Sequence, residues 1–247
     1  MSLKNKKIIA VIPARYGSTR LVGKPLIKIK GKTIVEYVYS NISSSKIIDE
    51  VIIATDDKRI YDAVESFGGK SVMTPLECPS GTDRIAYVMK LEGYSGYDII
   101  ANIQGDEPLI KLEDVENAVK LLIENNSDVS TLAVRISDLN DILNPNFVKV
   151  VMNKKSDALY FSRAPIPFSR DDRNFNSYYY KHIGVYIYTQ KTLLEFAGLK
   201  ESQLEKIEKL EQLRLLENSY RISVALTENN TIGLDTPDDL EKLEKYL

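Results

Sequence analysis

The sequence KIIAVIP at residues 7–13 decides the fold class, because it is an apolar, β-branched run that ends at a proline. Apolar residues at consecutive positions, rather than at alternate ones, indicate a strand buried on both faces, as in a parallel sheet. A loop rich in glycine and cations follows it, and a helical pattern follows the loop. The stretch therefore predicts the first strand of an α/β fold.

The first helical signal is at Thr33 and Glu36, which have the spacing of a capping box. The alternation then recurs along the chain. We expect strands at 51–54, 70–73, 98–103 and 129–134, and helices at 57–67 and 112–125. Such alternation predicts a three-layer α/β/α sandwich around a mainly parallel, mixed sheet.

After residue 145 the pattern becomes α+β. We expect strands at 148–152, 158–161, 182–189 and 222–226, a helix at 204–218, and a final helix that begins at Thr236-Pro237. No internal repeat is present, and no low-complexity linker separates the two halves. We interpret residues 1–247 as one domain whose halves share a sheet.

Composition excludes several classes of protein. The 33 Lys and Arg residues against 35 Asp and Glu residues leave no general basic field for nucleic acid. No apolar run approaches the ~18 residues of a membrane span, and the single cysteine, Cys78, excludes an intrachain disulfide. We expect a cytoplasmic protein with neither a nucleic-acid partner nor a membrane segment.

The loop ARYGSTRLVGKP, residues 14–25, has the composition of a phosphate-binding loop. In open α/β sheets ligands bind beyond the carboxyl ends of the strands, and this loop follows the first strand. It is not a Walker A loop, because five residues separate Gly17 from Gly23 and Pro25 stands where a hydroxyl residue would hold magnesium. A solvated basic loop is the alternative interpretation.

The segment NIQGDEP, residues 102–108, is a second candidate, at the end of the fourth expected strand. Asp106 and Glu107 offer the hard oxygen ligands that suit magnesium beside phosphates, although a turn with solvated acids would look similar. Asp235 precedes the cap of the final helix and is free for other work, whereas Asp238 and Asp239 are explained by capping.

Three further features have both a structural and a functional interpretation. The segment SGTDR at residues 80–84 could meet an anion or a base edge, or Thr82 could simply cap a helix. His182 is the only histidine, and a lone histidine is more often a structural residue than a catalytic one. Glu211 falls on the apolar stripe between Ile207 and Leu215 of its expected helix, where a buried carboxylate would need a partner.

Taken in order, IPARYGSTRLVGKPL, SGTDR, NIQGDEP, NPNFVKVV, ALYFSRAPIPF, HIGVYIY, EKLEQLRLLEN and GLDTPDDLE resemble the 3-deoxy-manno-octulosonate (Kdo) cytidylyltransferase family over nearly the whole chain. Val22 stands where that family usually has proline. The resemblance implies a Mg²⁺-dependent nucleotidyltransferase that joins CTP to Kdo, releases pyrophosphate and supplies lipopolysaccharide synthesis.

The resemblance also implies the parts of the chain and the roles of single residues. Residues 1–145 would bind CTP, 146–225 would bind the sugar and form a homodimer, and 226–247 would return to the core. Arg15, Lys24 and Asp106 would be catalytic, and Asp106 and Asp235 would ligate magnesium. The residues expected at CTP are Ala14, Arg15, Ser18, Lys24, Ser80, Gly81, Thr82 and Arg84, and those expected at the sugar are Gln104, Arg163, His182, Tyr186, Glu211 and Gln212.

Two alternatives to this function remain open. One is a cytidylyltransferase for a related sugar acid, such as 8-amino-Kdo or sialic acid. The other is a nucleotide-binding regulator without turnover, in which the loop at 14–25 would serve recognition only.

Overall fold

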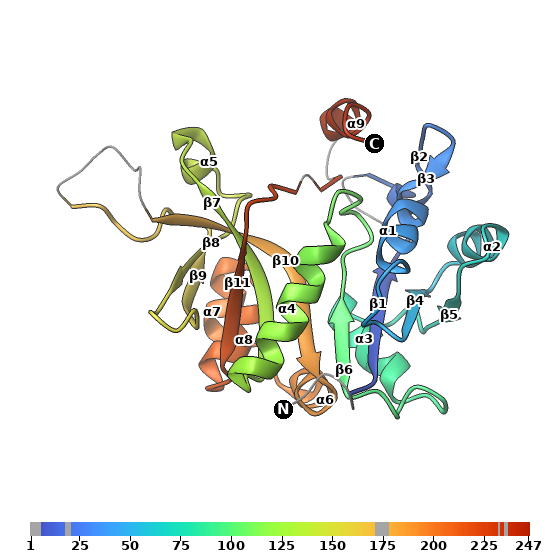
Figure 1. Cartoon of the computed structure of the whole chain (residues 1–247), viewed down its shortest axis with the longest axis horizontal. Coiled ribbons are helices and arrows are strands. Elements are labelled where there is room, and N and C mark those ends of the chain that lie inside the picture. The colour runs from blue at the N-terminus through green and yellow to red at the C-terminus, as the bar shows by residue number, and fades with distance from the viewer. Residues whose placement is uncertain (1–5, 18–20, 171–177, 232, 235–236) are drawn as a thin grey trace.

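The computed structural model describes residues 6–17, 21–170, 178–231, 233–234 and 237–247, without the side chains of residues 237 and 238. Within them a sheet of nine strands forms the centre of the molecule (Figure 1). Its main path runs β11 (Ile222–Thr227), β7 (Val129–Ile136), β10 (Tyr179–Thr189), β6 (Ile99–Asn102), β1 (Ile8–Ala14), β4 (Glu50–Thr55) and β5 (Ser71–Met73).

The sheet is mainly parallel and mixed, as predicted. Strand β10 is antiparallel to both of its neighbours on the main path, β6 and β7, whereas β1 pairs in parallel with β4 and β6. Strand β8 (Lys149–Met152) pairs with β10 and with β9 (Ala158–Ser162). Strands from both halves of the chain thus share one sheet, and β7 lies on the far side of β10 from the other strands of the first half.

Helices cover both faces of the sheet. The side chains of Ile8, Ala10 and Ile12 pack with α1 (Ile34–Ile42), α2 (Lys58–Ser66) and α4 (Leu112–Asn125). Ile9 and Val11 point to the other face, which is covered by α3 (Gly81–Met89), α6 (Gln190–Gly198), α7 (Gln203–Glu208) and α8 (Gln212–Glu217). The first strand is therefore buried on both faces, which confirms the prediction from KIIAVIP.

The capping box at the start of α1 is also confirmed. The Glu36 amide donates to Thr33 Oγ1 over 3.2 Å, and the Thr33 amide donates to the Glu36 carboxylate over 3.4 Å. Two backbone donors that a helix start leaves open are satisfied in this way.

Two expectations for helices are wrong. The helix expected at 204–218 is two short helices, because Lys209 adopts a left-handed conformation at φ 54° and ends α7. Ile207 is 70% exposed, so no continuous apolar stripe runs past Glu211. The cap of α3 is Ser80, whose hydroxyl accepts from the Asp83 amide, and not Thr82.

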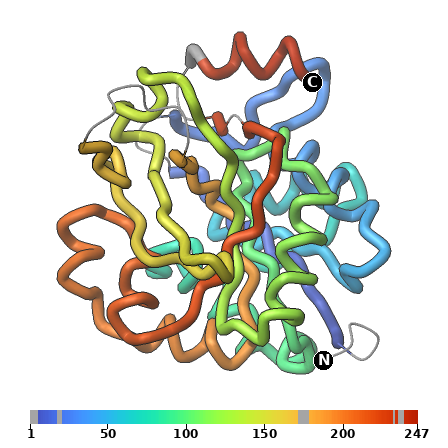
Figure 2. Tube along the Cα trace, turned by 60° about the vertical axis from the view of Figure 1, so that its left-hand side comes forward, coloured from blue at the N-terminus to red at the C-terminus, as the bar shows by residue number. Residues whose placement is uncertain are grey.

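The chain after β11 returns to the first half of the sequence. The Leu234 amide donates to the Asp106 carbonyl oxygen over 2.8 Å. Leu234 and Leu243, the latter from α9 (Pro237–Leu243), then pack with Ile29 and Ile34 beside the hairpin of β2 (Lys28–Ile29) and β3 (Lys32–Thr33) (Figure 2). The other described elements are the 3₁₀ turn η2 (Lys24–Leu26) and α5 (Leu139–Leu143).

None of the described helices combines the length and the apolar character needed to cross a bilayer.

Candidate functional site

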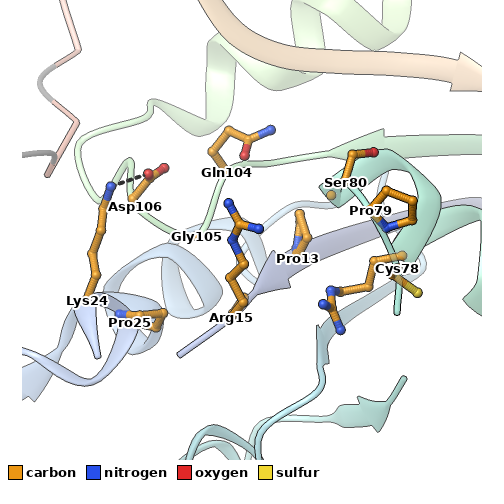
Figure 3. Close-up of a pocket in the computed structure, with 13 residues that line it drawn as sticks. Pro13, Arg15, Lys24, Pro25, Cys78, Pro79, Ser80, Gln104, Gly105 and Asp106 are labelled. Carbon is orange, nitrogen blue, oxygen red and sulfur yellow. Dashed lines mark hydrogen bonds and ion pairs between the residues drawn. The ribbon is translucent and has the colours of Figure 1, made fainter. Parts of the chain in front are cut away.

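A cavity of about 360 Å³, here called the large pocket, opens at the carboxyl ends of β1 and β6 (Figure 3). Its walls come from the ends of those strands, from η2 and from the start of α3. The lining residues are Pro13, Ala14, Arg15, Lys24, Pro25, Cys78, Pro79, Ser80, Gly81, Arg84, Gln104, Gly105 and Asp106. The first loop, SGTDR and NIQGDEP are thus brought together, where ligands of open α/β sheets bind.

Lys24 enters the large pocket because the first loop closes on itself. The Gly23 amide donates to the Tyr16 carbonyl oxygen over 2.9 Å. Gly23 has φ 71°, and a Cβ there would lie 3.0 Å from the Tyr16 ring, so only glycine fits without strain. The next residue is Lys24, whose Nζ lies 2.5 Å from Asp106 Oδ2.

Gly105 permits an equally close approach on the opposite wall. A Cβ at this position would lie 3.1 Å from the Pro13 carbonyl oxygen at the end of β1. The missing side chain lets NIQGDEP turn directly over that strand. Asp106, the next residue, consequently contacts Lys24, and Arg15 lies beside this pair, on the side of Gln104 and Pro13 (Figure 3).

Arg84 lines the same pocket from the first turn of α3. Its guanidinium donates to the Asp56 carboxylate over 2.6 Å and to the Thr74 hydroxyl, and both charged side chains are buried. The backbone amides at the start of α3, capped by Ser80, add the positive end of a helix dipole. These cationic groups suit a polyphosphate.

A second cavity of about 130 Å³, here called the small pocket, adjoins the large one, since Gly81 and Gln104 line both. Its other lining residues are Thr82, Asn102, Tyr186, Tyr188, Phe196, Glu211 and Gln212. Tyr186 reaches this wall because β10 pairs with β6 and places it beside Asn102.

The small pocket encloses a carboxyl group of altered acidity. Burial raises the pKa of Glu211, while a hydrogen bond from Thr82 and the charge of Arg214 oppose that effect. Burial also raises the pKa of Tyr186 far above its usual range. The small pocket therefore presents neutral hydrogen-bonding groups and one carboxyl, which suits a polyhydroxylated molecule.

Four expected sugar residues, Gln104, Tyr186, Glu211 and Gln212, line the small pocket, whereas the other two, Arg163 and His182, are outside both linings. The Arg163 guanidinium donates to the carbonyl oxygens of Pro145, Glu208 and Lys209.

His182 is buried behind Tyr186, with ring centroids 5.3 Å apart. Its Nε2 lies 2.9 Å from Thr131 Oγ1. Burial lowers the pKa of His182 to about 3, so the ring is neutral at physiological pH.

Thr82, expected at CTP, lines the small pocket instead of the large one. Of the other residues expected at CTP, Ser18 lies outside the described residues and the rest line the large pocket. Asp235 also lies outside the described residues.

Among the described residues, no group of three or more His, Cys, Asp and Glu side chains gathers to hold a metal ion. A magnesium ion needs fewer, because it is usually bound by one or two carboxylates together with substrate phosphates. Asp106 meets that requirement at the mouth of a cationic pocket. The bond from the Leu234 amide to the Asp106 carbonyl oxygen brings residues 233–234 to the backbone of Asp106.

Some lining residues had no signal strong enough to identify them from the sequence. Tyr188 and Phe196 reach the small pocket only through tertiary packing, whereas Asn102 begins the NIQGDEP segment that the sequence singled out. Asp56, which fixes Arg84, did carry a signal, because it directly follows a strand at the edge where ligands bind.

Comparison with known proteins agrees with this geometry. Residues 9–222 match the family model described as Cytidylyltransferase. The 3-deoxy-manno-octulosonate cytidylyltransferase of Thermodesulfovibrio yellowstonii is 54% identical over 97% of both chains. That of Geotalea uraniireducens is 49% identical over 98% of this chain and 99% of its own.

A solved structure shows the same relationship. A structure of CMP:2-keto-3-deoxy-manno-octonic acid synthetase complexed with CTP superposes with a TM-score of 0.90 and 43% identity, covering 97% of this chain and 98% of the other. The 4-diphosphocytidyl-2C-methyl-D-erythritol synthase of Anaerococcus prevotii shares the fold, with a TM-score of 0.67 and 18% identity over 98% of each chain. On this evidence the chain belongs to the 3-deoxy-manno-octulosonate cytidylyltransferase family.

Proposed function

We propose that this chain transfers CMP from CTP to the anomeric hydroxyl of Kdo, forming CMP-Kdo and pyrophosphate for lipopolysaccharide synthesis. The observation that carries the proposal is the shared wall of Gly81 and Gln104 between the large and small pockets. A nucleotide in the cationic pocket and a sugar in the polar one would meet at this wall.

The large pocket would hold CTP through groups of complementary charge. Arg15, Lys24 and Arg84 provide cations, and Ser80 and Gly81 provide the amino end of α3. Ala14 contributes the end of β1, and Ser18 of the same loop completes the proposed set. Thr82 is proposed to lie at the boundary between the two pockets, since it follows Gly81 of the shared wall, lines the small pocket and bonds to Glu211.

A magnesium ion would be held by Asp106 and Asp235. The hydrogen bond from the Leu234 amide to the Asp106 carbonyl oxygen supports this proposal, because it brings Leu234, which directly precedes Asp235 in the sequence, to the backbone of Asp106. The ion would supply charge neutralisation and polarisation of the phosphate oxygens when bound.

The small pocket would hold the sugar acid through Gln104, Tyr186, Glu211 and Gln212. His182 is proposed to support Tyr186 from behind, as the contact between their rings indicates. Because the His182 ring is neutral, it adds no positive charge to this wall of the small pocket, and the wall would bind the sugar by hydrogen bonds.

The reaction requires an in-line displacement at the α-phosphorus. A bond forms between the anomeric oxygen and phosphorus, the bond to the bridging oxygen of pyrophosphate breaks, and the hydroxyl proton is released. Lys24 and Arg15 would stabilise charge on the phosphate oxygens, and Gln104, at the shared wall, would orient the acceptor.

We also propose a homodimer built by residues 146–225. Leu159 is 61% exposed, Phe168 87% and Tyr178 71%, although all three are large apolar side chains. They come from β9, the chain after it and the chain before β10, and the β8–β9 hairpin lies at one end of the molecule (Figure 1). We propose that a second copy of the chain covers these apolar side chains. The double variant Leu159→Asp, Phe168→Asp should therefore be a monomer in sedimentation experiments.

Pyrophosphate release tests the proposed reaction. The protein is incubated with Mg²⁺, each of four nucleoside triphosphates, and Kdo, 8-amino-Kdo or sialic acid. Release with CTP and Kdo, and a product with the mass of CMP-Kdo, is expected. Binding of CTP without release in the presence of any acceptor would instead indicate a regulator.

A further inference from the structure

Lys149 on β8 is a buried ammonium group that neither pocket uses. Its side chain is 0% exposed, and Nζ donates to the carbonyl oxygens of Asn144, Phe147 and Arg163 over 2.9, 2.5 and 2.6 Å. Burial lowers the pKa of Lys149, and the nearby Arg163 charge adds to this effect. Burying a charge is costly, so its three bonds to carbonyl oxygens indicate that Lys149 fixes the conformation of the loops before β8 and after β9.

Arg163 extends the network from these loops to the junction of α7 and α8. Its carbonyl oxygen accepts from Lys149, and its guanidinium donates to the Glu208 and Lys209 carbonyl oxygens over 2.7 and 3.3 Å and to Pro145 over 2.9 Å. The Glu208 carboxylate in turn accepts from the Arg163 amide over 2.9 Å. Arg163 therefore holds this junction from both its backbone and its side chain.

The junction leads directly into the small pocket. Lys209 ends α7 in the left-handed conformation, Glu211 is the N-cap of α8, and Gln212 is its first residue. Helix α8 has six residues, and the Glu211 side chain makes no capping bond. So short a helix is not stabilised by its own hydrogen bonds, and its start must be fixed by tertiary contacts.

We infer that Lys149 and Arg163 are positioning residues for the acceptor, which set Glu211 and Gln212 in the small pocket through the Glu208–Lys209 turn. The inference rests on the proposed function and gives Arg163 a role without direct contact with the sugar. It predicts a selective effect, because the network reaches the small pocket and not the groups around Lys24 and Asp106.

The first test is the Lys149→Met variant. It should raise the KM for Kdo by about 2- to 30-fold, the range of mutations that act through a packed network, and leave the KM for CTP unchanged. If Lys149 only stabilised the fold, the variant would contain less active protein, and neither the KM for Kdo nor the KM for CTP would change. An unchanged KM for Kdo would overturn the inference.

Lys181 supplies a matched control. It is the register partner of Lys149 on β10, and burial lowers its pKa as well. Its Nζ instead donates to Asn230 Oδ1 and the Thr231 carbonyl oxygen over 3.0 and 3.1 Å. It also lies 4.3 Å from the centroid of the Phe147 ring, a contact that a methionine side chain can retain. At saturating Mg²⁺, Lys181→Met should not raise the KM for Kdo, and an equal rise would indicate general loosening of the sheet and overturn the inference.

A double-mutant cycle locates the effect. In a Gln212→Ala background, Lys149→Met should raise the KM for Kdo less than it does in the wild-type chain, because residues in one network are not additive. Full additivity would contradict the inference. If Lys149→Met does not fold, Arg163→Gln, at a half-buried position, makes the same predictions.

Hydrogen exchange separates this inference from the proposed function. Amides of residues 209–217 should exchange faster in Lys149→Met than in Lys181→Met, whichever sugar is the substrate. If wild-type protein does not turn over Kdo, the proposed function fails while the exchange result still decides the positioning role. Equal exchange in the two variants would remove that role.

Discussion

The large and small pockets are built in different ways, although they share a wall. The large pocket consists of loops that directly follow parallel strands, and each of its charged groups lies within a few residues of a strand or helix end. The small pocket takes Tyr186 from the antiparallel strand β10 and Glu211 from a junction between two short helices. The comparison teaches that the large pocket is encoded locally, whereas the small pocket depends on contacts far apart in sequence.

The largest expected effect tests the chemistry assigned to the large pocket. Lys24→Ala should lower kcat by on the order of 10² to 10³, because one preorganised donor to the developing charge is lost. Pyrophosphate release measures the effect, and circular dichroism checks the fold. Lys58→Ala, at an exposed lysine of α2, is the control and should retain full turnover. A normal kcat for Lys24→Ala would remove the first loop from the mechanism.

The next prediction concerns the carboxylates. Asp106→Asn should raise the Mg²⁺ concentration for half-maximal rate by about 10-fold or more, since changes around metal ligands commonly reduce affinity to that extent. Titration of Mn²⁺ into the CTP complex, followed by electron spin resonance, measures binding directly. Asp235→Asn should behave in the same way, and normal metal dependence in that variant would refute a site of two carboxylates.

A smaller effect is expected on the stability of the protein when the first loop, beside the large pocket, is strained. Gly23→Ala should reduce the free energy of unfolding by about 1–2 kcal/mol, because a side chain in the left-handed region is strained and this one would press on Tyr16. Urea denaturation measures the loss. Gly17→Ala is the matched control in the same loop, since a Cβ there meets nothing within 4 Å. Equal stability of the two variants would contradict the strain at Gly23.

The last prediction concerns the pH dependence of stability and His182, which packs behind Tyr186 of the small pocket. The folded-state pKa of His182 is about 3, below the ~6.5 of an unfolded histidine. Between these values the unfolded chain binds the extra proton, so the contribution to stability is present above pH 6.5 and is lost as the pH falls.

Wild-type protein should therefore lose up to about 1.4 kcal/mol per pH unit more than His182→Gln between pH 6 and 4. Urea denaturation at several pH values compares the two proteins. Parallel stability curves would show that His182 takes up its proton in the folded state as readily as in the unfolded chain.

The different construction of the pockets explains how far the sequence could be interpreted. The β1 run, the Thr33–Glu36 capping box and the loops at strand ends are local signals, and the structure has them where they were predicted. The break at Lys209 could not be predicted, because residues 204–218 have a good helical pattern and tertiary bonds from Ser162 and Arg163 hold the turn. Glu211 was singled out for a stripe that does not exist, since Ile207 points to solvent.

The position of β10 in the sheet has a consequence for how the protein is made. Among the described strands, β7 pairs only with β10 and β11, and both are synthesised after it. A nascent chain that ends near residue 145 carries β7 without a neighbour and β6 with one open edge, and open strand edges promote association with other chains. Residues 1–145 are therefore not expected to fold as a separate CTP-binding module. Strand β10 can join β7 to β6 only once residue 189 has left the ribosome.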